Sequence, residues 1–582
     1  MVLIFTNPDL LPEQTARGET IVLEGSPPSR AGTVRSLDES IDGRYAWIDG
    51  DAQRIAESLG GSCASWDTAR LDYDARTAAY LHARRLRYAL VKLLRTIVYF
   101  TDIRPLLAKE RLALHVCAGR DDDYVAVFRG LCRTSGSRLE VHYAGHAAKE
   151  SDPPPPNPAW RRALGCLLAS RRRGGGSRTR VILCGNARLL DPVCGALLAR
   201  KCRVWWLYDR FAPGTWLRRR RDGVKVLACD SSLGRRNPFF VEIDRPVVYR
   251  GVDLAKAVQA WLSSTVDENG AADARLIRRI DSHFERIRPD YLLVDEDATP
   301  IPRAAIALAR GRGMGSGVVQ HGVTCVRFGF APPAADRFFA WGEASRRQLI
   351  DWGYPPDRIV VTGAAQQGKA QSRVESAKRP ERVSGKPRRI LLLGTVPPRA
   401  NRPDAVGLHY TAETYRRMLE AALGAVARFG DIHLTVKPHP RALDDPILHE
   451  CLAGLVGLDA RVVTDLPPEA LFPSHDVVIS CFSSAGVEAL LYGVPVIQLV
   501  PQGSEGVLPY RRWGLAAEAR TARELDAELG RILDAPVSVR QSPAAAFAAT
   551  GEAAASAIAD AVLRRNQTPS ASAKQRTLTK AA

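Results

Sequence analysis

The feature that most constrains this chain is a regular alternation of short apolar segments with amphipathic ones in its C-terminal half. Strands are predicted, in chain order, at residues 389–394, 432–436, 460–463, 477–480 and 494–500. Helices are predicted between them at residues 412–429 and 486–492. This alternation predicts a mostly parallel sheet with helices on both faces, and such sheets bind ligands beyond the carboxyl ends of their strands. Polar residues that directly follow a strand are therefore the first candidates for a site.

The same alternation runs through much of the N-terminal half. Predicted strands lie at residues 112–117, 139–143, 181–184, 204–207, 291–294 and 317–320, and predicted helices at 191–200 and 301–310. The fold class is therefore α/β, with two Rossmann-like domains. The predicted division is an N-terminal segment of unclear fold (1–105), a Rossmann-like domain (106–376), a basic linker (377–389), a second Rossmann-like domain (390–540), a closing helix (541–565) and a disordered tail (566–582).

A predicted helix at residues 77–100 has two interpretations. Its apolar residues share one face and most of its basic residues lie elsewhere, as shown by Leu86, Leu90, Leu93, Leu94 and Ile97 against Arg84, Arg87, Lys92 and Arg95. We favour a helix whose apolar face packs on the protein core. The alternative is a basic amphipathic helix that lies on an anionic membrane surface.

An excess of basic residues bears on the partners of the chain. Its 582 residues include 82 Lys and Arg against 63 Asp and Glu, a net charge of +19. This charge is compatible with nucleic acid, an anionic membrane or phosphorylated substrates. Because no aromatic-interleaved basic patch and no nucleic-acid-binding motif is found, we predict no nucleic-acid partner.

The cysteines and the apolar segments bear on the cellular compartment in which the protein is expected. Eleven cysteines are scattered without a CxxC pair, which gives no metal-ligand spacing and suits a reducing environment. No signal peptide and no run of 18 apolar residues is found. The expected location is cytoplasmic, with inner-membrane association as an alternative.

Two groups of polar residues follow predicted strands of the second domain. Ser483 and Ser484 stand just before the helix at 486–492, where free backbone amides and the helix dipole attract phosphate; capping of the helix by Ser484 is the alternative. His439 lies between two prolines after the strand at 432–436, with Lys437 and Arg441 on either side. A positioned imidazole can donate to a departing phosphate, although a structural histidine in a turn shows the same pattern.

The helix after the serine turn carries a resemblance. The spacing of Glu488, Gly493 and Pro495 is similar to the sugar-nucleotide half-site of GT-B glycosyltransferases and of UDP-N-acetylglucosamine 2-epimerases. This resemblance implies that Glu488 binds the ribose, a task that suits a carboxylate because it offers only acceptors to hydroxyl donors. It also implies that Thr395 and Arg399, in the loop after the strand at 389–394, approach the donor phosphates.

Two further resemblances narrow the class of enzyme. The His-Pro corner with the two serines resembles the HP and Ser/Thr motifs of bacterial sialyltransferases and related transferases that use CMP-activated sugars. The segments PDYLLVD (289–295), GVVQHG (317–322), RFFAWG (337–342) and RIVVTG (358–363) resemble surface-polysaccharide transferases and CDP-glycerol glycerophosphotransferases. Together the resemblance covers roughly residues 285–500 and implies that His321 faces the interdomain cleft.

The catalytic base is left open among His321, Glu296 and Asp297. Sialyltransferases supply it from a D/E-D/E-G motif, whereas here Asp295-Glu-Asp297 is followed by Ala298. The same residues match the D-x-D metal signature of GT-A enzymes, an interpretation that two Rossmann-like domains disfavour. No metal and no cofactor is predicted, because GT-B enzymes usually rely on helix amides and cationic side chains.

These resemblances imply a GT-B glycosyltransferase with two domains facing a cleft. It would move a sugar from a nucleotide-sugar donor, CMP-linked first and UDP- or CDP-linked next, to a surface polysaccharide or glycolipid. The expected partners are this donor, a glycan or lipid-linked acceptor and, peripherally, an anionic membrane. The alternatives are a CDP-glycerol or polyol-phosphate transferase, an epimerase, and a catalytically inactive GT-B scaffold.

Overall fold

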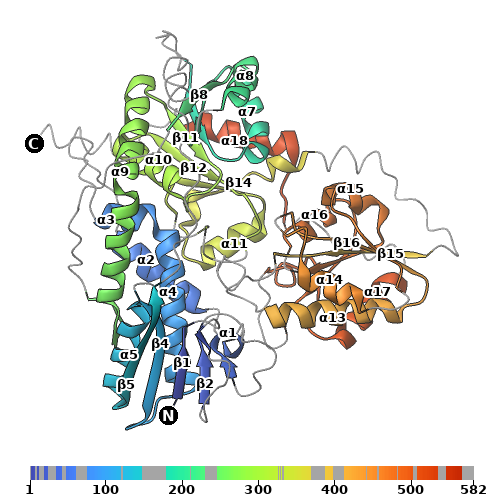
Figure 1. Cartoon of the computed structure of the whole chain (residues 1–582). Helices are drawn as coiled ribbons and strands as arrows, with labels where there is room; N and C mark the ends of the chain where they lie inside the picture. Colours follow the sequence, from blue (N-terminus) through green and yellow to red (C-terminus); the bar gives the residue numbers. More distant parts are fainter. Residues whose placement is uncertain are drawn as a thin grey trace, which may run out of the picture.

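Three parallel sheets, each in its own part of the molecule, organise the protein (Figure 1). The computed structural model describes residues 2–6, 10–11, 19–23, 34–41, 47–60, 75–118, 122–146, 178–209, 212–229, 246–324, 327, 329–330, 333–368, 387–396, 412–440, 442–454, 458–481, 483–501, 508–534 and 546–565. We call the three parts the N-terminal unit, the first Rossmann-like domain and the second Rossmann-like domain, in chain order.

The N-terminal unit contains a five-stranded sheet with the order β3-β2-β1-β4-β5. Its strands are β1 (Val2–Phe5), β2 (Glu19–Val22), β3 (Val34–Ser36), β4 (Arg111–Ala118) and β5 (Arg138–His146). Its helices are α1 (Leu37–Ser40), α2 (Trp47–Gly60), α3 (Ala75–Leu81), α4 (Ala83–Val98), the π-helix η3 (Tyr99–Ile103) and α5 (Asp122–Ser135).

Strands β4 and β5 correct the predicted start of the first Rossmann-like domain. We expected both in that domain, with the N-terminal segment ending at residue 105, but β4 pairs with β1 and β5 pairs with β4. The N-terminal sheet therefore extends to residue 146. An apolar strand pattern does not specify which sheet the strand joins, so the sequence alone could not place this boundary.

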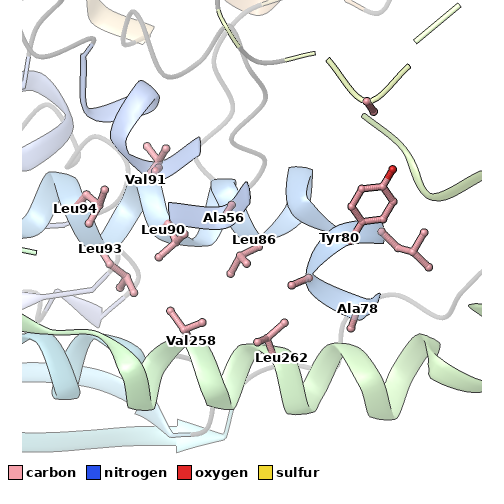
Figure 2. Close-up of a cluster of buried hydrophobic side chains, with 14 of the residues drawn as sticks. Ala56, Ala78, Tyr80, Leu86, Leu90, Val91, Leu93, Leu94, Val258 and Leu262 are labelled. Atoms are coloured by element: carbon pink, nitrogen blue, oxygen red, sulfur yellow. The ribbon is translucent and has the colours of Figure 1, made fainter. Parts of the chain in front are cut away.

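The predicted helix at 77–100 corresponds to α3, α4 and the beginning of η3, and its apolar face is buried. The core includes five of the predicted side chains, each at most 5% exposed: Leu86, Leu90, Leu93, Leu94 and Ile97. Figure 2 shows this face opposite Val258 and Leu262 of helix α9 (Ala255–Ile287). The core-facing interpretation is confirmed, and the apolar face is not available to a membrane.

The first Rossmann-like domain has seven parallel strands in the order β8-β7-β6-β11-β12-β13-β14. Counted from β6 this is 3-2-1-4-5-6-7, the doubly wound order with one further strand. The strands are β6 (Arg180–Cys184), β7 (Arg203–Tyr208), β8 (Lys225–Ala228), β11 (Tyr291–Val294), β12 (Gly315–Val319), β13 (Arg337–Ala340) and β14 (Ile359–Val361). The helices are α7 (Ala187–Ala199), α8 (Pro213–Arg221), α10 (Pro300–Gly311) and α11 (Glu343–Asp351), with 3-10 turns η4 (Pro356–Arg358) and η5 (Ala365–Gln367).

The chain between β8 and β11 fastens this domain to the N-terminal unit. It first forms the hairpin of β9 (Val248–Tyr249) and β10 (Val252–Asp253), where the Tyr249 hydroxyl donates to Asp51 of α2 at 2.9 Å. Helix α9, 33 residues long, then lies against α3, α5 and α10, as Figure 1 shows. One continuous hydrophobic core therefore serves both parts.

The second Rossmann-like domain has six parallel strands in the order β17-β16-β15-β18-β19-β20, which is 3-2-1-4-5-6 counted from β15. The strands are β15 (Arg388–Leu393), β16 (Ile432–Lys437), β17 (Ala460–Val462), β18 (Val477–Cys481), β19 (Val496–Leu499) and β20 (Ala517–Ala519). The helices are α13 (Ala412–Arg428), α14 (Pro446–Ala453), α15 (Pro468–Leu471), α16 (Ala485–Leu490) and α17 (Ala522–Asp534), with the 3-10 turn η6 (Phe472–Ser474). A separate core lies on one face of this sheet.

The chain crosses between the two Rossmann-like domains twice. Near the first crossing Ala364 forms a β-bridge with Thr550, which lies at the end of the second. Gly363 has φ +96°, and a Cβ there would lie 2.2 Å from the Ala549 carbonyl oxygen, so the close approach requires glycine. Helix α18 (Gly551–Arg565) then packs on α7 of the first domain, as Figure 1 shows. Two Rossmann-like domains with a closing helix form the predicted GT-B-like arrangement.

Three other observations complete the fold. The described cysteines are all free thiols. None of the helices in the described ranges combines the length and the apolar character needed to cross a lipid bilayer. Most of the predicted linker and the whole predicted tail lie outside the described residues.

Candidate functional site

Glu488 brings the carboxyl edges of the two Rossmann-like sheets together. It lies in α16, shortly after β18 of the second domain. Two residues of the first domain act on its carboxylate: Gln367 of η5, which follows β14, and Arg188 in the first turn of α7, which follows β6. Val487 of α16 and Ala364, which follows β14, also pack in one hydrophobic cluster, so the carboxyl ends of strands from both sheets lie against each other.

The carboxylate of Glu488 has an unusual electrostatic environment. Burial raises its pKa above the usual value, whereas Arg188 and Gln367 counteract this shift. An ionised carboxylate offers only acceptors, and withdrawal from water strengthens the hydrogen bonds that it accepts. Glu488 can therefore accept hydrogen bonds from the hydroxyl groups of a ligand at this edge.

The strand order of the second sheet reverses between β15 and β18, the type of position where doubly wound sheets bind ligands. The loop after β15 begins with Gly394 and Thr395, and Thr395 is 4% exposed. The turn after β18 contains Ser483 and Ser484. Predicted site residues from two distant parts of the sequence thus lie at the same edge of one sheet.

The serine turn is fixed by side chains on either side of it. Ser480 Oγ donates to the Ser483 carbonyl at 3.1 Å and accepts from the Ser483 N–H at 3.2 Å. The Tyr510 hydroxyl donates to the same carbonyl at 2.7 Å and accepts from the Val487 N–H at 3.2 Å. The turn is therefore held in one conformation by hydrogen bonds to both of its ends.

Ser484 is exposed in this turn and does not cap α16 with its side chain. The alternative of a purely capping serine is therefore not observed. The backbone N–H groups of Gly486 and Val487 donate to the carbonyls of Ser483 and Ser484, each at 3.1 Å. Fewer amides are thus free for a phosphate than the sequence predicted, and the hydroxyl of Ser484 is the more accessible donor.

The His-Pro corner follows β16, which is the neighbour of β15. The Gly394 N–H donates to the Lys437 carbonyl at 2.9 Å and so holds this corner beside the loop after β15. His439 is half-buried. The amine of Lys437 is buried and donates to the Thr464 carbonyl at 3.0 Å, and burial lowers its pKa. Lys437 would have to give up this bond to reach a phosphate.

The strand order of the first sheet reverses between β6 and β11. There the Asp295 carboxylate accepts from the Asn186 N–H at 2.7 Å, and burial raises the pKa of Asp295 to about 6. Gly185 has φ +148°, and a Cβ there would lie 2.1 Å from the Asp295 carboxylate. We did not predict Gly185 and Asn186 as site residues, although a Gly-Asn pair after the first strand of a Rossmann-like domain was the available signal.

The other two acidic residues after β11 differ in accessibility. Asp297 is 5% exposed, its carboxylate accepts from the Ala334 N–H at 2.9 Å, and burial raises its pKa to about 7. Glu296 is half-buried and accepts from the Ala298 N–H at 3.2 Å and from the Thr299 hydroxyl. Of these two candidate bases, Glu296 is therefore the one that a ligand can reach more easily.

His321 follows β12 and stacks on Phe330, with the ring centroids 4.6 Å apart and the planes 7° from parallel. Burial lowers the pKa of its imidazole below the usual value, against the opposing charge of Glu296. Among the described residues, no hydrogen-bond partner is found for its buried Nδ1. His321 is therefore a neutral imidazole near pH 7, and an imidazole nitrogen without a hydrogen can accept a proton.

Two predicted residues and two residues that were not predicted need a separate statement. Arg399 and Arg441 lie outside the described residues, so their phosphate contacts stay predictions. Arg188 and Gln367 were not predicted, because they reach Glu488 only through the packing of two domains.

No protein-family model matches the chain, and no curated protein matches it either. Among solved structures, the chain is similar to UDP-GlcNAc 2-epimerase from Neisseria meningitidis bound to UDP-GlcNAc, with 14% identity over 66% of this chain and 100% of that chain and a TM-score of 0.42. It is also similar to MurG from Acinetobacter baumannii, with 12% identity, coverage of 66% and 99%, and a TM-score of 0.38. For the wall teichoic acid polymerase TagF the identity is 12%, the coverage 70% and 93%, and the TM-score 0.36. These likenesses are distant, so the fold assignment rests on the strand orders and domain crossings above.

Proposed function

We propose that this protein is a glycosyltransferase that moves a sugar from a nucleotide-sugar donor to a surface polysaccharide or glycolipid. The observation that carries the proposal is the position of Glu488, a half-buried residue after β18 whose carboxylate interacts with Arg188 and Gln367 of the first domain. We favour a CMP-linked sugar as the donor, with UDP- and CDP-linked sugars next, because of the resemblance around His439 and Ser483.

In this proposal the second Rossmann-like domain holds the nucleotide. Glu488 accepts hydrogen bonds from the ribose hydroxyls, and the hydroxyls of Ser483 and Ser484 donate to the phosphate. His439 follows β16, which is separated from β18 by β15, and in this proposal its imidazole stabilises the charge of the leaving group. Thr395 and Lys437 approach the same phosphate in this proposal, and Arg399 and Arg441, which lie outside the described residues, stay predicted phosphate ligands.

The chemical step is a substitution at the anomeric carbon of the donor sugar. The acceptor hydroxyl forms a bond to this carbon, and the bond between the carbon and the phosphate oxygen breaks with its electron pair on the oxygen. The proton of the hydroxyl passes to a base on the first Rossmann-like domain, and the nucleotide leaves as an anion.

The base is chosen among three residues at one edge of the first sheet. We favour His321, which is neutral at pH 7, with Glu296 second because its carboxylate is accessible. Asp297 is third, because it is buried and its carboxylate accepts from the Ala334 N–H. Asp295 and Asp297 accept hydrogen bonds from different backbone segments, which argues against a D-x-D metal site.

Nucleotide binding to the full-length protein tests the proposal. We expect at least one of CMP, CDP, UDP and GDP to raise the melting temperature. Glu488→Gln keeps the shape of the side chain but removes its charge, so it should weaken binding of that nucleotide about tenfold. Glu420→Gln, on the exposed side of α13, is the matched control and should bind like the wild type.

Two results would contradict the proposal. One is a melting temperature that none of the four nucleotides changes. The other is an unchanged affinity in Glu488→Gln, measured by titration calorimetry on a variant that melts like the wild type. Either result would show that Glu488 does not take part in nucleotide recognition.

A further inference from the structure

One face of helix α2 connects the N-terminal unit to the candidate site. Gly50, Arg54 and Glu57 are spaced by four and three residues, so they lie on the same side of this helix. Glu57 forms a bidentate ion pair with Arg303 of α10, with N–O distances of 3.0 and 3.3 Å. Arg303 Nη1 lies 3.4 Å from the Asp297 carbonyl, to which it donates. Helix α2 is therefore fixed to the acidic turn after β11.

The same face of α2 also contacts the loop that carries His321. Arg54 Nη1 and Arg327 Cδ each lie 3.8 Å from the position that a Cβ on Gly50 would take, so both side chains lie beside Gly50. The Phe330 N–H donates to the Arg327 carbonyl at 3.1 Å, and the Phe330 ring stacks on His321. A short turn thus places the Arg327 side chain next to α2 and the Phe330 ring against the candidate base.

Two positively charged side chains thus approach the same residue, since Arg54 and Arg327 both lie beside Gly50. Burial and the charge of Arg54 lower the pKa of Arg327. An anion between two guanidinium groups would offset their repulsion, because carboxylate and phosphate oxygens accept hydrogen bonds from both.

Arg54 and Arg327 each have a described partner, but Arg54 stays largely exposed. Arg54 pairs with Asp51, but its side chain remains 65% exposed, and Asp51 also accepts from the Tyr249 hydroxyl. Glu296 is the carboxylate next to His321. Arg327 donates to the Trp352 carbonyl at 2.7 Å, which fixes one side of its guanidinium.

We propose that Arg54 and Arg327 form a subsite that binds the carboxylate or phosphate groups of an acidic glycan acceptor near His321. This inference rests on the proposed function, because it assigns the acceptor side of the same site. The N-terminal unit then recognises the acceptor, and its Glu57–Arg303 pair keeps the subsite at a constant distance from the reacting groups. Guanidinium groups suit this role because their planar set of donors matches carboxylate and phosphate oxygens.

Binding of three oligomers of similar size to the full-length protein tests this proposal. The probes are a sialic acid trimer, a glycerol phosphate trimer and neutral maltotriose, measured by titration calorimetry at low and physiological salt. We expect at least one of the two anionic probes to bind at least tenfold more tightly than maltotriose, with a difference that decreases as salt rises. The stronger of the two anionic probes identifies the source of the charge.

Variants locate the subsite. Arg54→Gln and Arg327→Gln should each weaken the anionic probe about tenfold, because each removes a charge-assisted hydrogen bond. Arg327→Lys keeps the charge and should recover part of the affinity. Arg523→Gln, an exposed arginine on α17, is the control and should bind like the wild type.

The outcomes separate this proposal from the proposed function. Equal affinity for charged and neutral probes, or wild-type affinity in both Arg→Gln variants, would overturn the subsite. The nucleotide-induced rise in melting temperature should be the same in all of these variants, since neither arginine of the subsite is assigned to the donor. If no nucleotide raises the melting temperature of the wild type, this result counts against the nucleotide pocket. The probe affinities still decide about the subsite.

Discussion

At the scale of single residues, the three consecutive acids after β11 show how differently neighbouring carboxylates can be used. Asp295 accepts from the turn after β6, and Asp297 accepts from the segment before β13. Glu296, between them, is the more accessible of the three. The sequence placed all three at a ligand-binding edge, but only the packing of other loops decides which of them a ligand can reach.

The pKa of Asp297 leads to a prediction for stability. Burial raises this pKa from 3.8 to about 7, so the folded protein holds a proton that the unfolded chain has already released. Stability from this group is therefore complete below about pH 4 and is lost as the pH rises to about 7. In Asp297→Asn the amide oxygen can accept the same bond from Ala334, and we expect this part of the pH dependence to disappear.

Urea unfolding between pH 4.5 and 7.5 measures this effect. Asp357→Asn, at an exposed position in η4, controls for the loss of one negative charge. The prediction is wrong if Asp297→Asn shows the same slope of unfolding free energy against pH as the wild type.

At the scale of helices and strands, much of the fold could be predicted from the sequence. The strand predicted at 291–294 is β11, and the helix predicted at 412–429 is α13 within one residue. Both have strong local patterns, a continuous apolar run and a regular apolar face. What the pattern does not contain is the partner of each strand, which is why β4 and β5 were assigned to the wrong sheet.

Helix α9 was not predicted, although it is the longest described helix at 33 residues. It lies against α3 and α5 near one end and α10 near the other, so its apolar residues serve two parts of the protein rather than one core face.

The candidate site, too, could be predicted from the sequence only where local patterns were sufficient. Residues after strands were found from the sequence, whereas Arg188 and Gln367 depend on contacts between distant elements.

The role of α9 leads to a second prediction. Leu262 is 2% exposed and faces α3 and α4 in Figure 2. Leu262→Ala should lower the free energy of unfolding by about 2–5 kcal/mol, because it leaves a cavity in a continuous core. We expect hydrogen exchange to increase in both α4 and α10. Lys256→Ala, exposed on the same helix, should leave both unchanged, and an increase confined to α4 would show that the core is not shared.

At the scale of the whole molecule, the closing helix determines which domain depends on the C-terminal part of the chain. Helix α18 follows the second Rossmann-like domain in sequence, but its apolar residues pack with Leu190, Val193 and Leu197 of α7. Arg200 also pairs with Asp560 at 2.7 Å. The stability of the first domain therefore depends on residues that are translated after the second domain.

A third prediction follows from this dependence. Ile558 is fully buried in α18, and Ile558→Ala should destabilise the first Rossmann-like domain by about 2–5 kcal/mol. Hydrogen exchange should increase in α7 and stay constant in α17, which belongs to the separate core of the second domain. Glu552→Ala, exposed on the same helix, is the control. Faster exchange in α17 alone would contradict the prediction, because it would mean that α18 stabilises the second Rossmann-like domain and not the first.

The two crossings between the Rossmann-like domains meet at one place on the first domain. Ala364 is bridged to Thr550, and the Ala364 N–H donates to the Ala549 carbonyl at 2.9 Å. Thr550 directly precedes α18, which packs on α7, so both partners of this pairing are attached to the first domain. The chain therefore leaves the first domain and returns to it at the same point, and a substitution at this pairing would disturb both connections to the second domain at once.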